Sequence, residues 1–136
     1  MTEYTNIEIG DQLTPRSFET TIVQLFMYNA AVWNPHRIHF DLDYAKNEEG
    51  YAGIVNDGPL QGDWMTQIVV DWMGESARLK SFKYSNRQAS YLGDRLQAVG
   101  TVVGKDDETR QVTLSLAIRN ANGDDIAPAE AIVEFS

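Results

Sequence analysis

The two histidines of the chain lie three residues apart in one polar segment, Trp33-Asn-Pro-His-Arg-Ile-His-Phe-Asp41. Histidine is the side chain best suited to proton transfer near neutral pH, and Asp41 and Asp43 follow His36 and His39 closely. The segment therefore indicates a small acid–base cluster. Two histidines that cap a helix or are hydrogen-bonded in a core have the same spacing, so both interpretations stay open. We expect no metal site, because the chain has no third histidine and no cysteine.

A second stretch with chemical potential, Gly50-Tyr-Ala-Gly-Ile-Val-Asn-Asp-Gly-Pro-Leu60, runs directly into an apolar helical pattern. Free backbone N–H groups and the positive dipole end at a helix start stabilise a developing oxyanion. Gly58 leaves the backbone open to close approach, and Tyr51, Asp57 and Pro59 are candidate substrate-binding neighbours. The alternative is that Asp57, Gly58 and Pro59 are only good helix-capping residues.

Basic residues are concentrated after this helix in an otherwise acidic chain. Such a cluster could receive the phosphates of coenzyme A, or it could be a solvated strand face that pairs with acidic neighbours. Side-chain alternation places Arg78 and Lys80 on the face opposite Lys83 and Arg87, so we expect that the four do not share one site. The phosphate candidates are Arg78, Lys80, Lys83 and Arg87.

Two helices frame the polar segment. Residues 20–33 carry apolar side chains around most of a helix circumference, with a threonine to cap the start and Pro35 to end the helix. Residues 58–73 form a second, more apolar helix with Asp57 as N-cap and Gly74 at its end, and a helix this apolar must be largely enclosed. Between them, residues 34–56 are a structured loop with one helical turn at 41–46.

After Gly74 the hydrophobic period changes to two, which is typical of strands. Short turns between the strands predict an antiparallel meander, and the chain is therefore α+β, with the sheet wrapped around the long helix. Residues 1–19 are predicted to be a loosely packed leader with one short strand. The predicted strands cover residues 79–89, 95–103, 110–119 and 126–135.

Composition limits the class of protein. The 136 residues include 20 acidic and 11 basic residues and no cysteine, giving a net charge of −9. This balance argues against nucleic acid and a polybasic membrane contact, and the missing thiols exclude disulfides and cysteine catalysis. The apolar runs are too short to span a bilayer and the start has no signal-peptide pattern. We expect one cytoplasmic domain over residues 1–136, which dimerises to cover its sheet edges.

The order of these features resembles the MaoC-like hot-dog dehydratases and hydratases over residues 16–135. The pattern Asn34-x-His-Arg-Ile-His-x-Asp41 is similar to the branch with 3-hydroxyacyl-thioester dehydratase and mesaconyl-CoA hydratase. Residues 71–81 are similar to the small chain of steroid side-chain enoyl-CoA hydratases, which works with a second hot-dog chain. The chain departs from the family pattern at Asn34, where the usual motif has Asp, and at Asp57, where relatives commonly carry His.

The resemblance implies a hot-dog fold and reversible hydration of a 2-enoyl thioester, with no cofactor beyond the coenzyme A of the substrate. It implies that His39 is the general acid and base, that Asn34 orients the water, and that His36 supports or replaces the missing carboxylate. The acyl chain would lie along the buried helix, where Trp64, Ile68 and Trp72 either line a tunnel or are plain core residues.

Two other functions fit the same resemblance. One is a non-catalytic hot-dog subunit that completes the site of a partner chain. The other is an acyl-CoA thioesterase in which Asp57 is the base or nucleophile. The partner is either a second copy, giving a homodimer, or another hot-dog chain, giving a heteromer.

Overall fold

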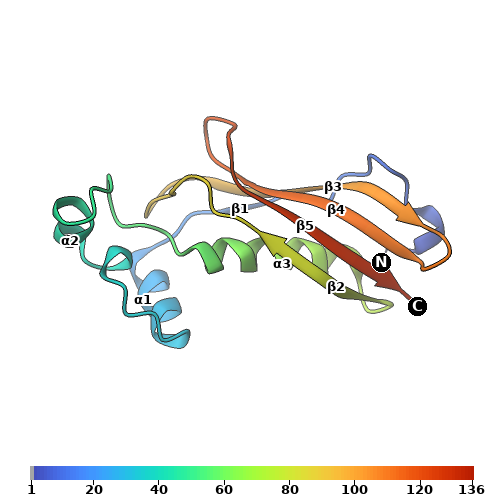
Figure 1. The fold of residues 1–136 in the computed structure, drawn as a ribbon, viewed down its shortest axis with the longest axis horizontal. Coiled ribbons are helices and arrows are strands. Elements are labelled where there is room, and N and C mark those ends of the chain that lie inside the picture. The colour runs from blue at the N-terminus through green and yellow to red at the C-terminus, as the bar shows by residue number, and fades with distance from the viewer. Residues whose placement is uncertain (1) are drawn as a thin grey trace.

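The computed structural model describes residues 2–136, which form a five-stranded antiparallel sheet with the order β1-β3-β4-β5-β2 (Figure 1). The strands are β1 (Arg16–Phe18), β2 (Ala77–Tyr84), β3 (Leu96–Asp106), β4 (Gln111–Arg119) and β5 (Asp125–Phe135). The helices are α1 (Ile22–Ala31), α2 (Leu42–Asn47) and α3 (Gly58–Met73), with 3₁₀ turns at Tyr4–Asn6 and Arg37–His39. The predicted α+β class and both long helices are confirmed.

Helix α3 packs along the sheet with one apolar side (Figure 1), whereas its sequence predicts a largely enclosed helix: Val70, on the other side, is 51% exposed. Its core residues recur three or four positions apart, which places them on one side of the helix. Pro59 suits the first turn, and Gly74, at a φ of 69°, ends the helix. The side chain of Asp57 stands at the N-cap position but accepts no hydrogen bond from the first turn, so it is free for other contacts. The buried residues are Leu60, Gln61, Gly62, Trp64, Met65, Ile68, Val69 and Met73.

The predicted meander is correct for β3, β4 and β5 and wrong for β2. β2 pairs with β5, with Ala77 opposite Phe135, and so forms the edge of the sheet opposite β1. The connection from β2 to β3 passes the start of α3, where Tyr91 forms a β-bridge with Val55. A connection held at that place cannot be a tight hairpin, and β3 therefore joins the sheet with β4 and β5 between it and β2.

The alternation predicted for the basic residues of β2 is also wrong. A β-bulge between Leu79 and Ser81 inserts one extra residue into the strand. Arg78 lies opposite Glu134 and Lys83 opposite Glu130, and these two glutamates are four residues apart on β5. They share a face of the sheet, so Arg78 and Lys83 do as well.

The N-terminal segment is packed rather than loose. Tyr4, Ile7 and Leu13 are all buried and belong to the main core, and β1 pairs with β3. The Leu13 N–H donates to the carbonyl of Gly100 at 2.9 Å. The scattered apolar residues have no regular period because each enters the core from an irregular backbone. Met1 lies outside the described residues.

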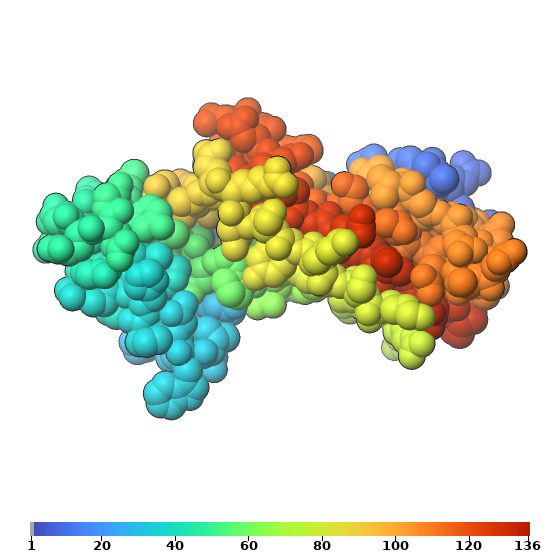
Figure 2. All heavy atoms as spheres, viewed as in Figure 1, coloured from blue at the N-terminus to red at the C-terminus, as the bar shows by residue number. Residues whose placement is uncertain are grey.

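Helices α1 and α2 lie together at the end of the molecule that is away from the termini (Figures 1 and 2). Helix α1 is capped by Thr21, as predicted, but it buries only Leu25 and Asn29. The apolar residues predicted around its circumference are largely at the surface, where Phe26 is 67% exposed and Trp33 91% exposed. This face of α1 is the most apolar part of the described surface that no other element covers: Ile22, Val23, Phe26, Met27, Val32 and Trp33.

We predict that Leu13→Ala destabilises the chain by about 2–5 kcal/mol, because it leaves a cavity among the side chains between β3 and β4. Ile9→Ala is the matched control, since Ile9 is 68% exposed and its truncation is expected to cost under about 0.5 kcal/mol. Denaturant unfolding of both variants measures the difference. Equal stabilities would contradict a packed N-terminal segment.

Candidate active site

The candidate site lies where the segment after α1 meets the start of α3. Helix α1 ends with Trp33 in the left-handed region, at a φ of 54°, and the Asn34 N–H donates to the Asn29 carbonyl at 3.0 Å. This helix-ending arrangement usually has glycine at the left-handed position, and a bulky residue there is strained. Pro35 then directs the chain into the 3₁₀ turn that carries His39.

His39 is buried and held in one orientation. Its Nδ1 lies 2.7 Å from the carbonyl oxygen of Val55, whose N–H donates to the carbonyl of Ile38 at 2.9 Å. A carbonyl oxygen can only accept, so Nδ1 carries the hydrogen of the neutral ring. The second nitrogen, Nε2, is therefore the one available for proton transfer, and it lies 3.5 Å from Oδ2 of Asp57.

Asp57 is a fully buried carboxylate. The Asn29 side-chain amide donates to its Oδ1 at 2.9 Å, and the Asn34 side-chain amide donates to its Oδ2 at 3.1 Å. A buried carboxylate is costly unless it is hydrogen-bonded, and the two amides together with the positive end of α3 offset that cost. The four side chains of Asn29, Asn34, His39 and Asp57 thus form one polar cluster.

Asn29 was not among the predicted site residues. Its amide nitrogen also donates to the Leu25 carbonyl at 2.8 Å, while its buried Oδ1 has no hydrogen-bond partner within residues 2–136. Asn29 and Asn34 border a hollow of about 430 Å³ whose other walls are apolar. An asparagine in the middle of an apolar helix was the sequence signal that could have indicated it. The other residues around the hollow are Phe26, Ala30, Trp33, Pro35 and Phe40.

Gly58 opens α3 beside this cluster. A Cβ at Gly58 would overlap the side-chain amide of Asn86, whose Oδ1 accepts from Gln61 Nε2 at 3.2 Å. Glycine is required here because Asn86 packs onto the helix start, a contact that nothing in the sequence indicates. Within residues 2–136 the Gly58 N–H donates no hydrogen bond, as is usual for the first N–H groups of a helix, so an oxyanion could accept from it.

A second set of buried polar groups holds the start of α3 in place. Asn56 accepts a hydrogen bond from the Thr20 hydroxyl at 2.6 Å and donates to the Ser90 hydroxyl at 3.0 Å. The Ser90 hydroxyl donates to the Gln61 side chain at 3.1 Å. These bonds connect α3 to the segment before α1 and to the connection between β2 and β3. The helix start is therefore a rigid support for its neighbours.

The other residues of the predicted acid–base cluster point elsewhere. His36 is half-exposed, with Nε2 at 3.7 Å from the Glu49 carboxylate, and its ring meets His39 edge-on at 5.8 Å between centroids. Asp41 caps α2 and binds Arg37, and the Arg37 guanidinium holds the pKa of Asp41 below its usual value. Tyr51 packs into the small apolar cluster under the loop. Of the carboxylates near the two histidines, Asp57 is the one next to His39.

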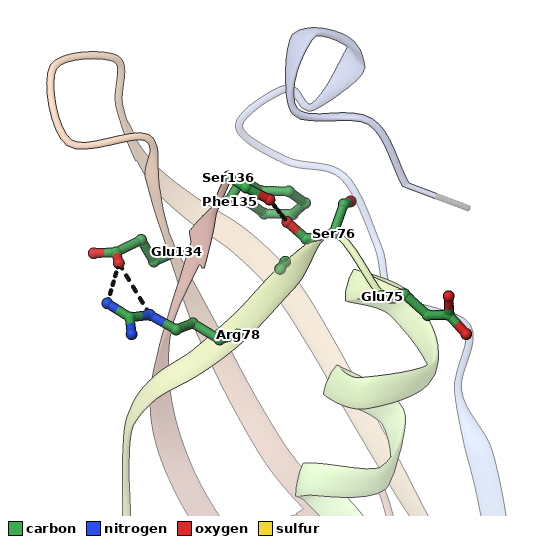
Figure 3. A pocket seen from close by; sticks show the side chains of 7 residues that line it. Glu75, Ser76, Arg78, Glu134, Phe135 and Ser136 are labelled. Carbon is green, nitrogen blue, oxygen red and sulfur yellow. Dashed lines mark hydrogen bonds and ion pairs between the residues drawn. The ribbon is translucent and has the colours of Figure 1, made fainter.

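The four phosphate candidates do not gather at this site. Arg78 and Lys80 both bind Glu134, just beyond the C-terminal end of α3, and Figure 3 shows Arg78 directed at that carboxylate. Because α3 has 16 residues it is about 24 Å long, and Gly58 is at its other end. Lys83 lies 3.5 Å from Glu130. Arg87 directly follows Asn86 and has no carboxylate partner within the described residues.

The predicted tunnel along α3 is wrong. Trp64 and Ile68 are each 2% exposed and fill the core, with Phe18 stacked on Trp64 at 4.5 Å between ring centroids. Trp72 packs against the same core beside Phe135. The apolar hollow lies instead against α1, next to Asn29 and Asn34.

Two further features concern metal binding and membranes. Among residues 2–136, no three His, Asp or Glu side chains are grouped closely enough to hold a metal ion. No helix in the same range has the length and apolar character needed to cross a membrane.

The fold is shared with several solved structures. An (R)-hydratase from A. caviae involved in PHA biosynthesis has a TM-score of 0.88 at 17% identity, over 96% of this chain and 98% of that chain. A structure titled MaoC-like dehydratase has a TM-score of 0.89 at 18% identity, over 98% and 42%. One chain of the ChsH1–ChsH2 complex from Mycobacterium tuberculosis has a TM-score of 0.83 at 21% identity, over 95% and 98%. These likenesses define the hot-dog fold.

Sequence comparison identifies the family. The model of hydroxyacyl-thioester dehydratase type 2 matches residues 4–92, and the chain belongs to this family of MaoC-like hot-dog proteins. Mesaconyl-C(4)-CoA hydratase of Chloroflexus aurantiacus is 56% identical over 36 residues, which are 26% of this chain and 13% of that protein. The mitochondrial hydroxyacyl-thioester dehydratase type 2 of Saccharomyces cerevisiae is 27% identical over 71 residues, 52% and 25% of the two chains. The matches span a quarter or less of either relative.

We predict that the ion pairs of Glu134 stabilise the fold in a pH-dependent way. Lys80 and Arg78 lower the pKa of Glu134 from 4.5 to about 2. A lowered pKa in the folded state means that the stabilisation is present above pH 4.5 and is lost as the pH falls towards 2. The stability difference between wild type and Glu134→Gln should therefore shrink over this range in denaturant unfolding.

Glu130→Gln is the control, because Glu130 faces one lysine at 3.5 Å and is more exposed. A difference for Glu134→Gln that stays constant from pH 6 to 2 would show that Arg78 and Lys80 do not hold an ionised partner, and would leave them free for phosphate.

Proposed function

We propose that the chain catalyses the reversible addition of water to a 2-enoyl thioester, the hydratase and dehydratase chemistry after which its family is named. The observation that carries the proposal is the state of His39. The Val55 carbonyl occupies Nδ1, which leaves Nε2 for proton transfer in a buried site at the start of a 16-residue helix. Such a site combines a base with a donor for developing negative charge.

The reaction needs one proton carrier and one anion-stabilising group. As the water oxygen bonds to C3, His39 Nε2 takes a proton from it, and the π electrons of the C2–C3 bond move onto the thioester oxygen. The Gly58 N–H and the dipole of α3 stabilise that oxygen. The imidazolium then returns the proton to C2 and the thioester carbonyl re-forms, so one proton is taken and one is given back.

The asparagines provide the polar surface for the attacking water. Asn34 donates to Asp57 and borders the apolar hollow, as does Asn29. The unpartnered, buried Oδ1 of Asn29 accepts the second hydrogen of the water, which offsets the cost of leaving that atom unpaired. His36 supports the His39 ring through its edge contact.

The substrate in this proposal is an acyl-CoA. Its acyl group occupies the apolar hollow against α1, because the same two asparagines border the hollow and hold Asp57. Of the four basic candidates, Arg87 is free of carboxylates and next to Asn86 at the helix start, so Arg87 receives a phosphate. Coenzyme A enters only as part of the substrate.

We further propose that the chain works with a second hot-dog chain. Strand β2 is an eight-residue edge strand, and α1 exposes a row of apolar side chains. Both features are typical of surfaces that a partner covers. The ChsH1–ChsH2 complex and the HadBC complex of similar fold are assemblies of two different chains, which makes a heteromer as reasonable as a homodimer.

We predict that His39→Ala lowers the hydration of crotonyl-CoA at least about 100-fold, since it removes the proton carrier. The assay follows the loss of the conjugated enoyl-thioester absorbance, with the protein alone and with its natural partner. His36→Ala is the matched comparison and is expected to lose less than about tenfold, because His36 only touches the edge of the His39 ring.

Three outcomes would contradict the proposal. A folded His39→Ala variant with full activity would remove His39 from the chemistry. Hydration that needs a partner chain and ignores His39 would show a non-catalytic subunit. Release of free thiol in place of hydration would show a thioesterase.

We predict that Ala30→Phe shifts the preference towards short acyl chains, because the new ring fills the hollow beside Asn29 and Asn34. The KM for decenoyl-CoA should rise at least about tenfold while that for crotonyl-CoA changes little. Met27→Phe is the control, since Met27 is on the same helix but does not border the hollow. Equal KM changes for the two acyl chains would place the acyl group elsewhere.

A further inference from the structure

Asp57 is a buried carboxylate to which the reaction described so far gives no role. An N-cap aspartate normally accepts from the N–H groups of the first helical turn. The carboxylate of Asp57 makes no such bond and is turned towards Asn29, Asn34 and His39. Giving up the cap costs about 1 kcal/mol, so the contacts that the carboxylate makes instead must compensate for it.

Among the neighbours of Asp57, His39 is the one that can carry a positive charge to pair with the carboxylate. The two asparagines are neutral donors, and within residues 2–136 no lysine or arginine forms an ion pair with this carboxylate. Nδ1 of His39 is bonded to the Val55 carbonyl, so Nε2 is the nitrogen that faces Oδ2 of Asp57, 3.5 Å away. If Nε2 carried no proton, its lone pair would face a lone pair of the ionised carboxylate in a buried site. A proton on Nε2 turns this repulsion into an ion pair.

The other charged groups near His39 lie farther away or are occupied. The His36 ring is 5.8 Å from the His39 ring and faces Glu49, and Arg37 is bound to Asp41. From helix α1, the group that contacts the Asp57 carboxylate is the neutral side-chain amide of Asn29. Asp57 is therefore the one carboxylate in the described structure that acts directly on Nε2.

We propose that Asp57 is a positioning residue whose negative charge holds the proton that His39 takes from water. As His39 accepts that proton it becomes positively charged, and the adjacent carboxylate stabilises the charge until the proton passes to C2. Asp57 itself is fully buried and acts only through His39. The kinetic part of this inference rests on the proposed hydratase function, whereas the ion pair itself does not.

The test compares wild type, Asp57→Asn and the exchanged variant Asn34→Asp/Asp57→Asn. Asp57→Asn removes the charge at nearly unchanged size, and no capping bond is lost because the Asp57 side chain makes none. The exchanged variant keeps one carboxylate against one amide at the 3.1 Å contact between positions 34 and 57. Asp71→Asn is the matched control, because Asp71 is an exposed aspartate on the same helix.

The first readout needs no activity. The chain has two histidines, so ¹⁵N NMR at one fixed pH resolves His39 once a His36→Ala sample assigns the signals. We expect the Nε2 resonance of His39 to move in Asp57→Asn, to return towards its wild-type position in the exchanged variant, and to stay unchanged in Asp71→Asn, because the carboxylate beside Nε2 is lost only in the first. An unchanged Nε2 resonance in Asp57→Asn would overturn the inference, as would no return on exchange.

The second readout is kinetic. Asp57→Asn should lower kcat at least about tenfold with KM and melting temperature near those of wild type, and the exchanged variant should regain part of the loss. A folded Asp57→Asn variant with wild-type kcat would overturn the inference. If wild type itself hydrates no enoyl-CoA, the proposed function fails, and the NMR comparison still decides whether Asp57 and His39 form the pair.

Discussion

The hydrogen bond from Nδ1 of His39 to the Val55 carbonyl determines the chemistry open to this chain. It fixes which ring nitrogen carries hydrogen, and so directs the other nitrogen at Asp57 and the start of α3. The bond is short, buried and held on both sides, because Val55 donates back to Ile38 and bridges to Tyr91. Without it the imidazole could turn, and the buried carboxylate would face no defined partner.

The fold separates the apolar support from the polar site. One side of α3, the strands β3, β4 and β5, and the N-terminal segment share one continuous apolar core. The buried polar groups lie together at one end of α3. There the side-chain amides of asparagines and a glutamine act as hydrogen-bond donors and acceptors. A buried polar cluster is stable only when its members are satisfied, and among residues 2–136 one buried side-chain polar atom has no partner. That exception, Asn29 Oδ1, borders the hollow in which we place the substrate.

Much of the fold could be predicted because its signals are local. Asp57, Pro59 and Gly74 delimit α3, and alternation reveals β4. The pairing of β2 with β5 depends on contacts far apart in sequence, and the bulge in β2 depends on its partner strand. Neither the pairing nor the bulge can be recognised in the local alternation of polar and apolar residues. The packed N-terminal segment was missed for a related reason, since its anchors follow no period.

The candidate site was predicted in part. The structure brings together four candidates from the sequence, His39, Asn34, Asp57 and Gly58, and their catalytic roles stay predictions. The contact between Asp57 and His39 was not predictable, because an aspartate at the N-cap position normally accepts from N–H groups of its own helix. Asn29 and Asn86 act through tertiary contacts that no spacing reveals. The resemblance to hot-dog hydratases indicated the chemistry, and the structure adds the amides around the buried carboxylate.

The most direct test of the account is a crystal structure of the chain, with its partner if it has one, bound to a 3-hydroxyacyl-CoA. The account predicts that the C3 hydroxyl lies within hydrogen-bond distance of His39 Nε2 and that the thioester oxygen accepts from the Gly58 N–H. A thioester bound away from the start of α3, or a C3 hydroxyl directed away from His39, would contradict it.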